Sequence, residues 1–337
     1  MIKINLAING FGRIGRAACK IIIDRFPNVN VVGINDLTDP HTLAHLMKFD
    51  SCYGKYSHKI SATKEAIIVN GHKIPVFSSK VPSELPWQKL KVDVVLECSG
   101  KFRTKEELEL HLKAGAKKVI LSAPPKKSNV KTIVLGVNEN KLTKNDIVIS
   151  CASCTTNCLA PVTEVIRRNF GIKKALMTTI HSYTADQNLV DGPHSDLRRA
   201  RAAALNIVPT TTGAAISVTE AMPSLKNNFD GLAIRVPTPV GSLCDTVYLL
   251  KKKTNAEAVN RIFKKAADGK FKGIIEASEE ELVSTDIVGN PHSAIVDLLT
   301  TKVVGGDLLK LVAWYDNEWG YANRLVELAI YLQKLKK

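Results

Sequence analysis

The sequence predicts a doubly wound α/β domain with a parallel sheet, followed by an α+β domain whose sheet is mixed and largely antiparallel. Three observations support this prediction. The first half alternates short β-branched runs with helical patterns, as parallel strands and crossover helices do. A glycine-rich turn joins the first strand pattern to the first helical pattern. The second half has long strand-like stretches and fewer helices, which indicates a separate α+β domain.

The elements of the first half follow in order. Strand patterns occupy Lys3–Asn9, Val29–Asn35, Val92–Cys98, Lys118–Ser122 and Asp146–Ser150. Helical patterns lie between them, notably at Arg13–Arg25 and Thr104–Ala114. In a doubly wound sheet the ligand lies beyond the carboxyl ends of the strands, so we expect a binding site at that edge.

The second half opens with a helix at about Thr155–Asn169. One further helical pattern lies at Ala256–Ala267. The strand patterns of this half are Ala175–Ser182, Gly231–Pro237, Thr246–Lys252, Ser293–Asp297 and Leu309–Trp314. The last segment, from Glu318 onward, is an amphipathic helix that we expect to pack back on the first domain. We therefore predict one domain of residues 1–153 with the helix 318–337, and a second domain of residues 154–317.

Length and composition fit an ordinary globular protein. The 337 residues are enough for two domains, and 45% hydrophobic and 23% charged residues are average values. Apolar runs are too short to cross a bilayer, so no membrane role is expected. Residues Met1–Leu6 run straight into a strand pattern without the features of a signal peptide, which favours a cytoplasmic location.

The cysteines and the charge narrow the class further. The odd number of cysteines, seven, indicates free thiols in a reducing compartment. Cys151, Cys154 and Cys158 lack a partner pair at zinc-site spacing, so no metal is expected. The net charge of +15 leaves nucleic-acid or surface binding open. The basic residues are scattered without interleaved aromatic residues, which favours a solvated basic surface.

A G-x-G-x-x-G sequence spans residues 10–15 directly after the first strand pattern. Gly10 permits the tight turn, Gly12 lets the backbone approach a pyrophosphate, and Gly15 allows close helix–strand packing. Asp36 ends the next strand pattern and is placed to accept a hydrogen bond from a ribose 2′-hydroxyl. This context predicts a Rossmann dinucleotide site that prefers NAD to NADP.

A candidate nucleophile lies at the domain junction. Cys154 stands where a strand pattern passes into a helix, and the positive end of a helix dipole favours the thiolate. His181, at the end of a later strand pattern, is a candidate base. Taken singly, each residue is equally well explained as a buried core residue, so spacing alone leaves the pairing open.

These motifs resemble the glyceraldehyde-3-phosphate dehydrogenase family over nearly the whole chain. Their order and spacing agree with that family, and several of the segments are specific to it. The matching segments are residues 8–16, 152–158, 178–184, 209–215, 235–238 and 314–318.

The resemblance implies a phosphorylating, NAD-dependent enzyme that acts on glyceraldehyde 3-phosphate and inorganic phosphate as a homotetramer. Cys154 would be the nucleophile and His181 its partner. The implied NAD contacts are Gly10, Gly12, Arg13, Ile14, Gly15, Asn35, Asp36, Lys80, Ser122 and Asn317. The substrate's phosphate would meet Thr184, Asp186 and Arg235, with Asp186 orienting Arg235 or a ligand hydroxyl. Inorganic phosphate would meet Ser153, Thr155, Thr212 and Gly213, with Arg198 as a weaker addition.

The sequence departs from the family pattern in two places. Cys151 stands where Asn is usual, and Val240-Gly241-Ser242 replaces the usual Asn-Val-Ser. Two alternatives remain: the related erythrose-4-phosphate dehydrogenases, and a basic nucleic-acid-binding protein on the same fold. Thr184, Thr212 and Gly213 favour the phosphorylating enzyme over the first alternative, since the erythrose-4-phosphate enzymes lack them.

Overall fold

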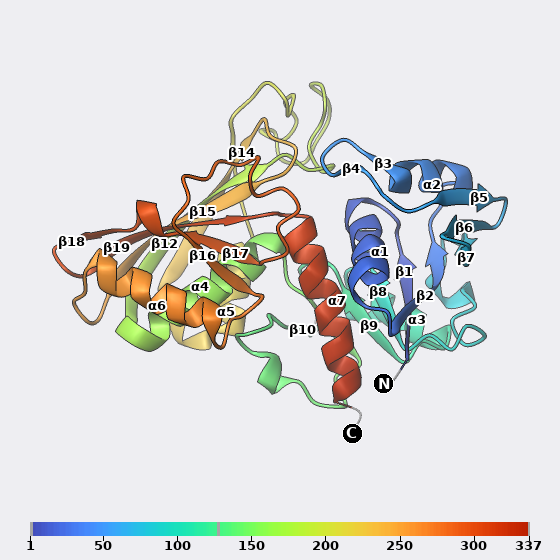
Figure 1. Cartoon of the computed structure of the whole chain (residues 1–337), viewed down its shortest axis with the longest axis horizontal. Coiled ribbons are helices and arrows are strands. Elements are labelled where there is room, and N and C mark those ends of the chain that lie inside the picture. Colours follow the sequence, from blue (N-terminus) through green and yellow to red (C-terminus); the bar gives the residue numbers. More distant parts are fainter. Residues whose placement is uncertain (1–2, 127–128, 336–337) are drawn as a thin grey trace. The chain divides into compact units, whose positions relative to one another are not determined.

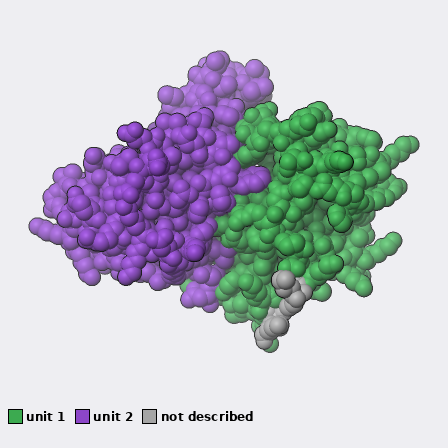
Figure 2. All heavy atoms as spheres, viewed as in Figure 1, with its two compact units in different colours: residues 1–133, 141–152, 322–337 green, residues 134–140, 153–321 purple. Residues whose placement is uncertain are grey.

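The computed structural model describes residues 3–126 and 129–335. It divides into two compact units, which Figure 2 colours separately. Unit 1 comprises residues 1–133, 141–152 and 322–337, and unit 2 comprises residues 134–140 and 153–321. Residues 336–337 of the predicted C-terminal helix, and residues 1–2, lie outside the described part. No helix in the described part is long and apolar enough to cross a membrane.

Unit 1 is built on a nine-stranded sheet (Figure 1). Its strands are β1 (Ile4–Asn9), β2 (Val29–Asn35), β5 (Ile60–Thr63), β6 (Ala66–Val69), β7 (His72–Phe77), β8 (Val94–Glu97), β9 (Lys118–Leu121), β10 (Lys131–Thr132) and β11 (Val148–Ser150). The order across the sheet is β10-β11-β9-β8-β1-β2-β7-β6-β5. Neighbours from β10 to β7 pair in parallel, and only β6 and β5 add antiparallel pairs at one edge. The doubly wound prediction is confirmed.

Two helices of unit 1 begin at residues whose side chains cap the first N–H groups. In α3 (Lys105–Lys113), Thr104 and Glu107 form a reciprocal capping box. In α2 (Pro40–Lys48), the Asp39 carboxylate accepts from the first free N–H groups. The helix α1 (Arg13–Arg25) begins at the glycine turn. The last helix, α7 (Trp319–Lys334), touches the unit 1 sheet, because Lys118 of β9 donates to the Leu332 carbonyl at 3.1 Å.

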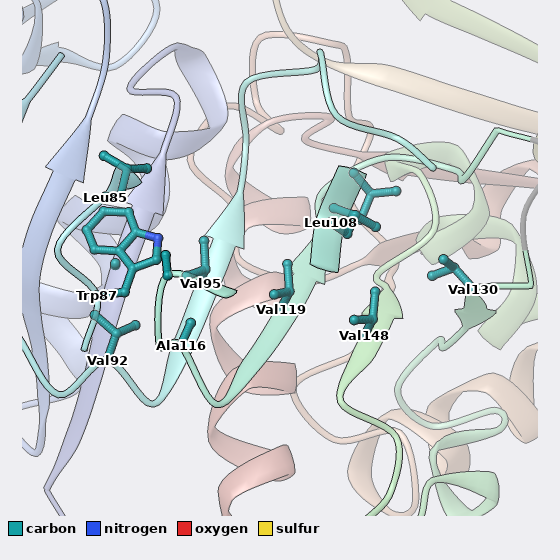
Figure 3. Packing of buried hydrophobic residues seen from close by; sticks show 12 residues of the cluster. Leu85, Trp87, Val92, Val95, Leu108, Ala116, Val119, Val130 and Val148 are labelled. Carbon is teal, nitrogen blue, oxygen red and sulfur yellow. The ribbon is translucent and has the colours of Figure 1, made fainter. Parts of the chain in front are cut away.

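The core of unit 1 fills the space against this sheet. Figure 3 shows Trp87 beside Leu85 and Val92, with Val95 and Val119 of the neighbouring strands in the same cluster. All these side chains are buried, and the cluster includes β-branched residues on three parallel strands: Val95, Val119 and Val148. The carboxyl ends of the strands are therefore held on a rigid base.

Unit 2 contains an eight-stranded sheet. Its strands are β12 (Ile172–Ser182), β13 (Val208–Thr210), β14 (Phe229–Val236), β15 (Ser242–Leu250), β16 (Ile275–Ser278), β17 (Ala294–Asp297), β18 (Lys302–Val304) and β19 (Leu308–Tyr315). Its helices are α4 (Cys154–Phe170), α5 (Ala214–Ala221) and α6 (Ala256–Asp268). Only β12–β14 and β16–β17 pair in parallel. The predicted mixed, largely antiparallel sheet is confirmed.

Several elements carried too weak a pattern to be predicted. Residues 40–77 fold as α2, two short strands at Phe49–Asp50 and Gly54–Lys55, and the β5–β7 hairpins. These strands are short and partly exposed, so alternation is not visible over enough residues. The three-residue β13 and the eight-residue α5 were missed because each is too short to show a clear periodicity. Single-turn 3-10 helices lie at Pro82–Glu84, Glu139–Lys141, Pro223–Leu225 and Leu298–Thr300.

Candidate active site

The glycine turn of unit 1 has the geometry that a pyrophosphate needs. Gly10 has φ +90°, and a Cβ there would lie 2.5 Å from the Ser99 backbone. A Cβ at Gly15 would lie 2.2 Å from the Gly10 carbonyl oxygen, so Gly15 allows the helix to pack closely on the turn. Gly12 caps α1 and faces open space. The start of α1, where a helix offers N–H groups and a partial positive charge, therefore opens onto space that an anion can occupy.

A cavity of about 520 Å3 opens beside this turn. Five of the predicted contacts line it: Gly10, Gly12, Asn35, Asp36 and Lys80. The prediction missed the other lining residues, which come from strand ends and the segment after β8: Asn9, Leu37, Ser79, Cys98, Ser99, Lys101 and Phe102. Asn9 had a signal in the sequence, since it is the last strand residue before the glycine turn.

Asp36 and Arg13 are both held by protein partners. The Asp36 carboxylate accepts from the Phe11 N–H at 2.8 Å and from the Thr38 N–H at 2.9 Å. The Arg13 guanidinium donates to Asp50 at 2.7 Å and lies over the Tyr53 ring. Asp36 therefore faces the cavity in a fixed orientation, whereas the Arg13 side chain is directed to Asp50. Arg13, Ile14, Gly15 and Ser122 are not among the residues that line the cavity.

In unit 2, Cys154 is the first residue of α4. Ser153 caps this helix, because its hydroxyl accepts from the Thr156 N–H at 3.1 Å. The Cys154 Sγ lies 3.4 Å from the Nε2 of His181, which belongs to β12. The structure therefore brings together the two residues whose pairing the spacing alone left open.

The hydrogen bonds of His181 set its tautomer. Its Nδ1 has two neighbours, the Ser182 carbonyl oxygen at 2.7 Å and the Arg235 Nη1 at 3.2 Å. The carbonyl oxygen can only accept and is the nearer of the two, and Nη1 has the same carbonyl as an acceptor, so we assign the ring proton to Nδ1. The Nε2 lone pair then faces the thiol. Burial, followed by the nearby Arg235 charge, lowers the pKa of His181 to about 3. The imidazole is consequently neutral at physiological pH and able to accept the thiol proton.

The prediction of a low thiol pKa from the helix dipole needs correction. Burial raises the pKa of Cys154 above its usual value, although the Arg235 charge and hydrogen bonds with Thr155 act in the opposite direction. At rest the structure favours a neutral thiol beside a neutral imidazole. The thiolate forms when the proton passes from Sγ to Nε2 during attack.

Arg235 lies next to His181 in the parallel register of β12 and β14. Its Nη1 donates to the Ser182 carbonyl at 3.1 Å and to the Thr184 hydroxyl at 3.2 Å. Its Nε is buried and has no hydrogen-bond partner in the structure. All the hydrogen bonds of Arg235 with described residues use Nη1, so the Nη2 group is the donor left for a ligand, and a guanidinium suits phosphate well.

Asp186 contacts a different arginine from the one expected. Its carboxylate pairs with Arg199 at 2.6 Å, so it does not orient Arg235 as expected, while the alternative, a contact with a ligand hydroxyl, stays a prediction. Arg199 also donates to the Thr210 hydroxyl and the Thr211 carbonyl. The neighbouring Arg198 reaches the Pro209 carbonyl and is exposed. Arg199 was missed because adjacent arginines look identical in the sequence.

The other predicted phosphate contacts differ in accessibility. Gly213 caps α5, and the Thr212 hydroxyl accepts from the Ala214 N–H at 3.2 Å. Thr155 is buried, with its hydroxyl 2.8 Å from the Tyr315 hydroxyl. Thr212 and Gly213 therefore present a helix start to a ligand, whereas the Thr155 side chain faces the interior.

The second departure from the family pattern holds Asn317 in place. The Asn317 Oδ1 accepts from the Gly241 N–H at 3.2 Å and from the Ser242 hydroxyl at 2.9 Å. Gly241 has φ +95°, and a Cβ there would lie 2.3 Å from the Ser284 carbonyl oxygen. Both hydrogen bonds use the oxygen, which leaves the amide Nδ2 to donate.

A Rossmann unit together with a thiol–imidazole pair and arginine donors defines a class: dehydrogenases that oxidise an aldehyde through a cysteine thioester. Comparison with known proteins agrees. Residues 4–105 match the NAD binding domain of glyceraldehyde 3-phosphate dehydrogenase, and residues 153–317 match its C-terminal domain.

Relatives cover nearly the whole chain. A glyceraldehyde-3-phosphate dehydrogenase of Thermotoga maritima is 52% identical over 98% of this chain and 99% of its own length. Glyceraldehyde-3-phosphate dehydrogenase 1 of Bacillus subtilis is 50% identical over 99% of each chain, and a Streptomyces coelicolor enzyme of the same name is 49% identical over 98% and 99%. The chain belongs to the glyceraldehyde-3-phosphate dehydrogenase family. Neither the erythrose-4-phosphate nor the nucleic-acid-binding alternative is favoured.

Proposed function

We propose that the chain oxidises glyceraldehyde 3-phosphate with NAD⁺ and inorganic phosphate to 1,3-bisphosphoglycerate. The observation that carries this proposal is the 3.4 Å contact between the Cys154 Sγ and the His181 Nε2, beside Arg235. The relatives' shared name supports the same substrate.

The residues of unit 2 account for the covalent steps. His181 Nε2 takes the Cys154 proton as Sγ attacks the aldehyde carbon, and the proton returns to the oxygen to give a thiohemiacetal. His181 then removes the hydroxyl proton while a hydride leaves the same carbon, and a thioester remains on Cys154. Inorganic phosphate attacks the thioester carbonyl, and the C–S bond breaks to restore Cys154. NAD⁺, when bound, supplies the hydride acceptor.

Two groups of donors fit the two phosphates. Arg235 and Thr184 would hold the phosphate of the substrate, since the Arg235 Nη2 has no hydrogen-bond partner among the described residues. Thr212 and Gly213 at the start of α5 would hold inorganic phosphate, with Ser153. Arg199, rather than Arg198, is the arginine we assign to this region.

The residues that would hold NAD⁺ follow from the fit of the cavity. Gly10, Gly12 and the start of α1 suit a pyrophosphate, whereas Asn35 and Asp36 present polar groups for the adenosine ribose. Asn317 would donate its Nδ2 to the nicotinamide carboxamide. We also propose that NAD⁺ contacts Lys80, which lines the cavity. Four further residues remain proposed contacts, or residues that support the contacts: Arg13, Ile14, Gly15 and Ser122.

The test is the appearance of NADH from glyceraldehyde 3-phosphate with and without inorganic phosphate. We expect steady turnover with phosphate and at most one equivalent per active site without it, because the thioester then has no acceptor. Steady turnover without phosphate would contradict the phosphorylating assignment. Faster turnover of erythrose 4-phosphate would favour the related enzyme.

We also infer a homotetramer in the cytoplasm. Large apolar side chains are exposed along residues 189–207 and on neighbouring elements of unit 2, with Leu197 82% and Leu205 84% exposed. Patches of this kind mark protein interfaces, and a second copy of the chain is the occupant that the homotetramer implied by the resemblance requires. The seven cysteines all lie in the described residues and none is in a disulfide, as expected in a reducing compartment.

Light scattering should therefore give about four times the 36.8 kDa of one chain. Leu205→Glu would place a charge in the contact and should lower this mass. A wild-type mass of one chain would contradict the assembly.

A further inference from the structure

A chain of buried polar groups lies beneath the cavity of unit 1. Glu97, Asn9 and Asn35 end the adjacent strands β8, β1 and β2, and Asn9 is in register with both of the others. The Glu97 side chain is fully buried. Its Oε2 accepts from the Asn9 Nδ2 at 2.5 Å and from the His111 Nε2 at 2.9 Å. Its Oε1 accepts from the N–H and hydroxyl of Ser99.

Trp87 determines which ring nitrogen of His111 donates and which accepts. The Trp87 indole N–H can only donate, and it lies 3.0 Å from the His111 Nδ1. His111 Nδ1 must therefore accept, so the ring proton is on Nε2 and is donated to Glu97. Figure 3 shows Trp87 in the hydrophobic core, so this end of the chain of groups is anchored there.

The other end gives the same direction. The Ser79 backbone N–H donates to the Asn35 Oδ1 at 2.9 Å, which turns the Asn35 Nδ2 toward the Asn9 Oδ1 at 2.7 Å. The Asn9 Nδ2 is then left to face Glu97. Asn9, His111 and Ser99 therefore all donate to the Glu97 side chain. A side chain at this position must accept hydrogen bonds at both of its terminal atoms. A carboxylate meets this requirement, and a carboxamide does not.

We propose that Glu97 is a positioning residue for the cofactor. It holds the amide orientations of Asn9 and Asn35 and the hydroxyl of Ser99, all of which line the cavity. Because these side chains are already oriented before binding, less entropy is lost when they are ordered around the adenosine half of a dinucleotide. This inference rests on the proposed placement of NAD⁺ in that cavity.

Glu97→Gln tests it, because the variant keeps the shape and places an NH2 group against a donor. Either amide orientation meets donors: Ser99 on one side, Asn9 and His111 on the other. The readouts are the Kd of ADP-ribose, which contains no nicotinamide, the KM values of both substrates, and kcat. We expect ADP-ribose and NAD⁺ to bind about tenfold more weakly. The kcat at saturating NAD⁺ and the KM of the aldehyde should change less than about threefold.

Glu164→Gln is the matched control. Glu164 is also a buried carboxylate, but it pairs with Arg167 and Arg168 in unit 2. The Glu164→Gln variant should change the thermal stability of the protein without changing its affinity for ADP-ribose. If Glu97→Gln cannot be purified folded, Glu97→Asp keeps the acceptors at shorter reach and should weaken ADP-ribose binding by a smaller factor.

Unchanged ADP-ribose affinity in the folded Glu97 variants would overturn the inference while leaving the wild-type activity, and hence the proposed function, intact. Parallel losses in kcat, aldehyde KM and ADP-ribose affinity would also overturn it, as a general effect on folding. A wild-type chain that bound neither ADP-ribose nor NAD⁺ would instead contradict the proposed function.

Discussion

The nucleotide cavity of unit 1 and the thiol site of unit 2 are built in different ways. The cavity is formed by strand ends and by backbone that only glycine permits at Gly10. At the thiol site, side chains from α4, β12 and β14 meet, and Cys154 and His181 are 27 residues apart in the sequence. The first site therefore depends on backbone shape, and the second on burial and charge. Changes at the second site should affect chemistry while cofactor binding persists.

The largest expected effect is that of His181→Asn. Without the base, the thiol proton has no acceptor, and kcat should fall by ~10²–10⁴-fold with NAD⁺ affinity nearly unchanged. Steady-state kinetics and calorimetric titration with NAD⁺ measure the two quantities. His292→Asn is the control, since His292 is in the same unit and pairs with Glu276. A loss below tenfold, or an equal loss of NAD⁺ affinity, would contradict the separation of the two sites.

Arg235→Leu should have the next largest effect. It removes charge-assisted hydrogen bonds of about 1.5–3 kcal/mol to a phosphate, or ~10–150-fold in kcat/KM. The loss should appear with glyceraldehyde 3-phosphate and be much smaller with unphosphorylated glyceraldehyde. Equal losses on both aldehydes would show that Arg235 does not bind the phosphate.

Acid should destabilise the protein through His181. Its pKa is about 3 when folded and near 6.5 when unfolded, so only the unfolded chain gains this proton between these values. The free energy of unfolding should therefore fall as pH drops below 6.5, by about 2 kcal/mol at pH 5. Urea unfolding of the wild type and of His181→Asn at pH 7 and 5 isolates this contribution. Equal pH dependence in the two proteins would refute it.

Asp36→Ala should have the smallest effect of this series. Its carboxylate faces the cavity and should repel a 2′-phosphate, so the variant should narrow the preference for NAD⁺ over NADP⁺ by about tenfold. Because Asp36 also accepts from the Phe11 N–H, kcat/KM for NAD⁺ should fall as well. The ratio of kcat/KM for the two cofactors is the measurement. Similar kcat/KM values for NAD⁺ and NADP⁺ in the wild type would contradict the proposal that Asp36 selects NAD⁺.

The contrast between the sites also explains what the sequence could predict. The strand Val29–Asn35 and the helix Arg13–Arg25 have the predicted bounds, because hydrophobic periodicity and the glycine turn are local signals. The Asp186–Arg199 pair was not predictable, since nothing local distinguishes Arg199 from Arg198. The buried Thr155 hydroxyl and the network of Glu97 likewise depend on packing between distant segments.

The pKa of Cys154 shows the same limit. Its position at the start of α4 is a local feature and was predicted, but the opposing effect of burial comes from the folded unit. A local argument therefore located the proposed nucleophile but misjudged its resting protonation. Reactivity then depends on His181 rather than on the helix alone.

The most direct test of this account is the pH dependence of Cys154 alkylation by iodoacetamide, followed by mass spectrometry and activity. Cys52, Cys98 and Cys154 are partly exposed and the other cysteines are buried. Because the His181 Nε2 lies 3.4 Å from the Cys154 Sγ, the first label should fall on Cys154, and activity should be lost in step. Since proton transfer within the pair changes no net charge, the rate should be nearly constant between pH 5 and 8. The alkylation rate of a free thiol rises about tenfold per pH unit in this range, and the His181→Asn variant should show that rise at Cys154. First labelling of Cys151 or Cys158 with activity retained, or an identical pH profile in His181→Asn, would contradict the Cys154–His181 pair.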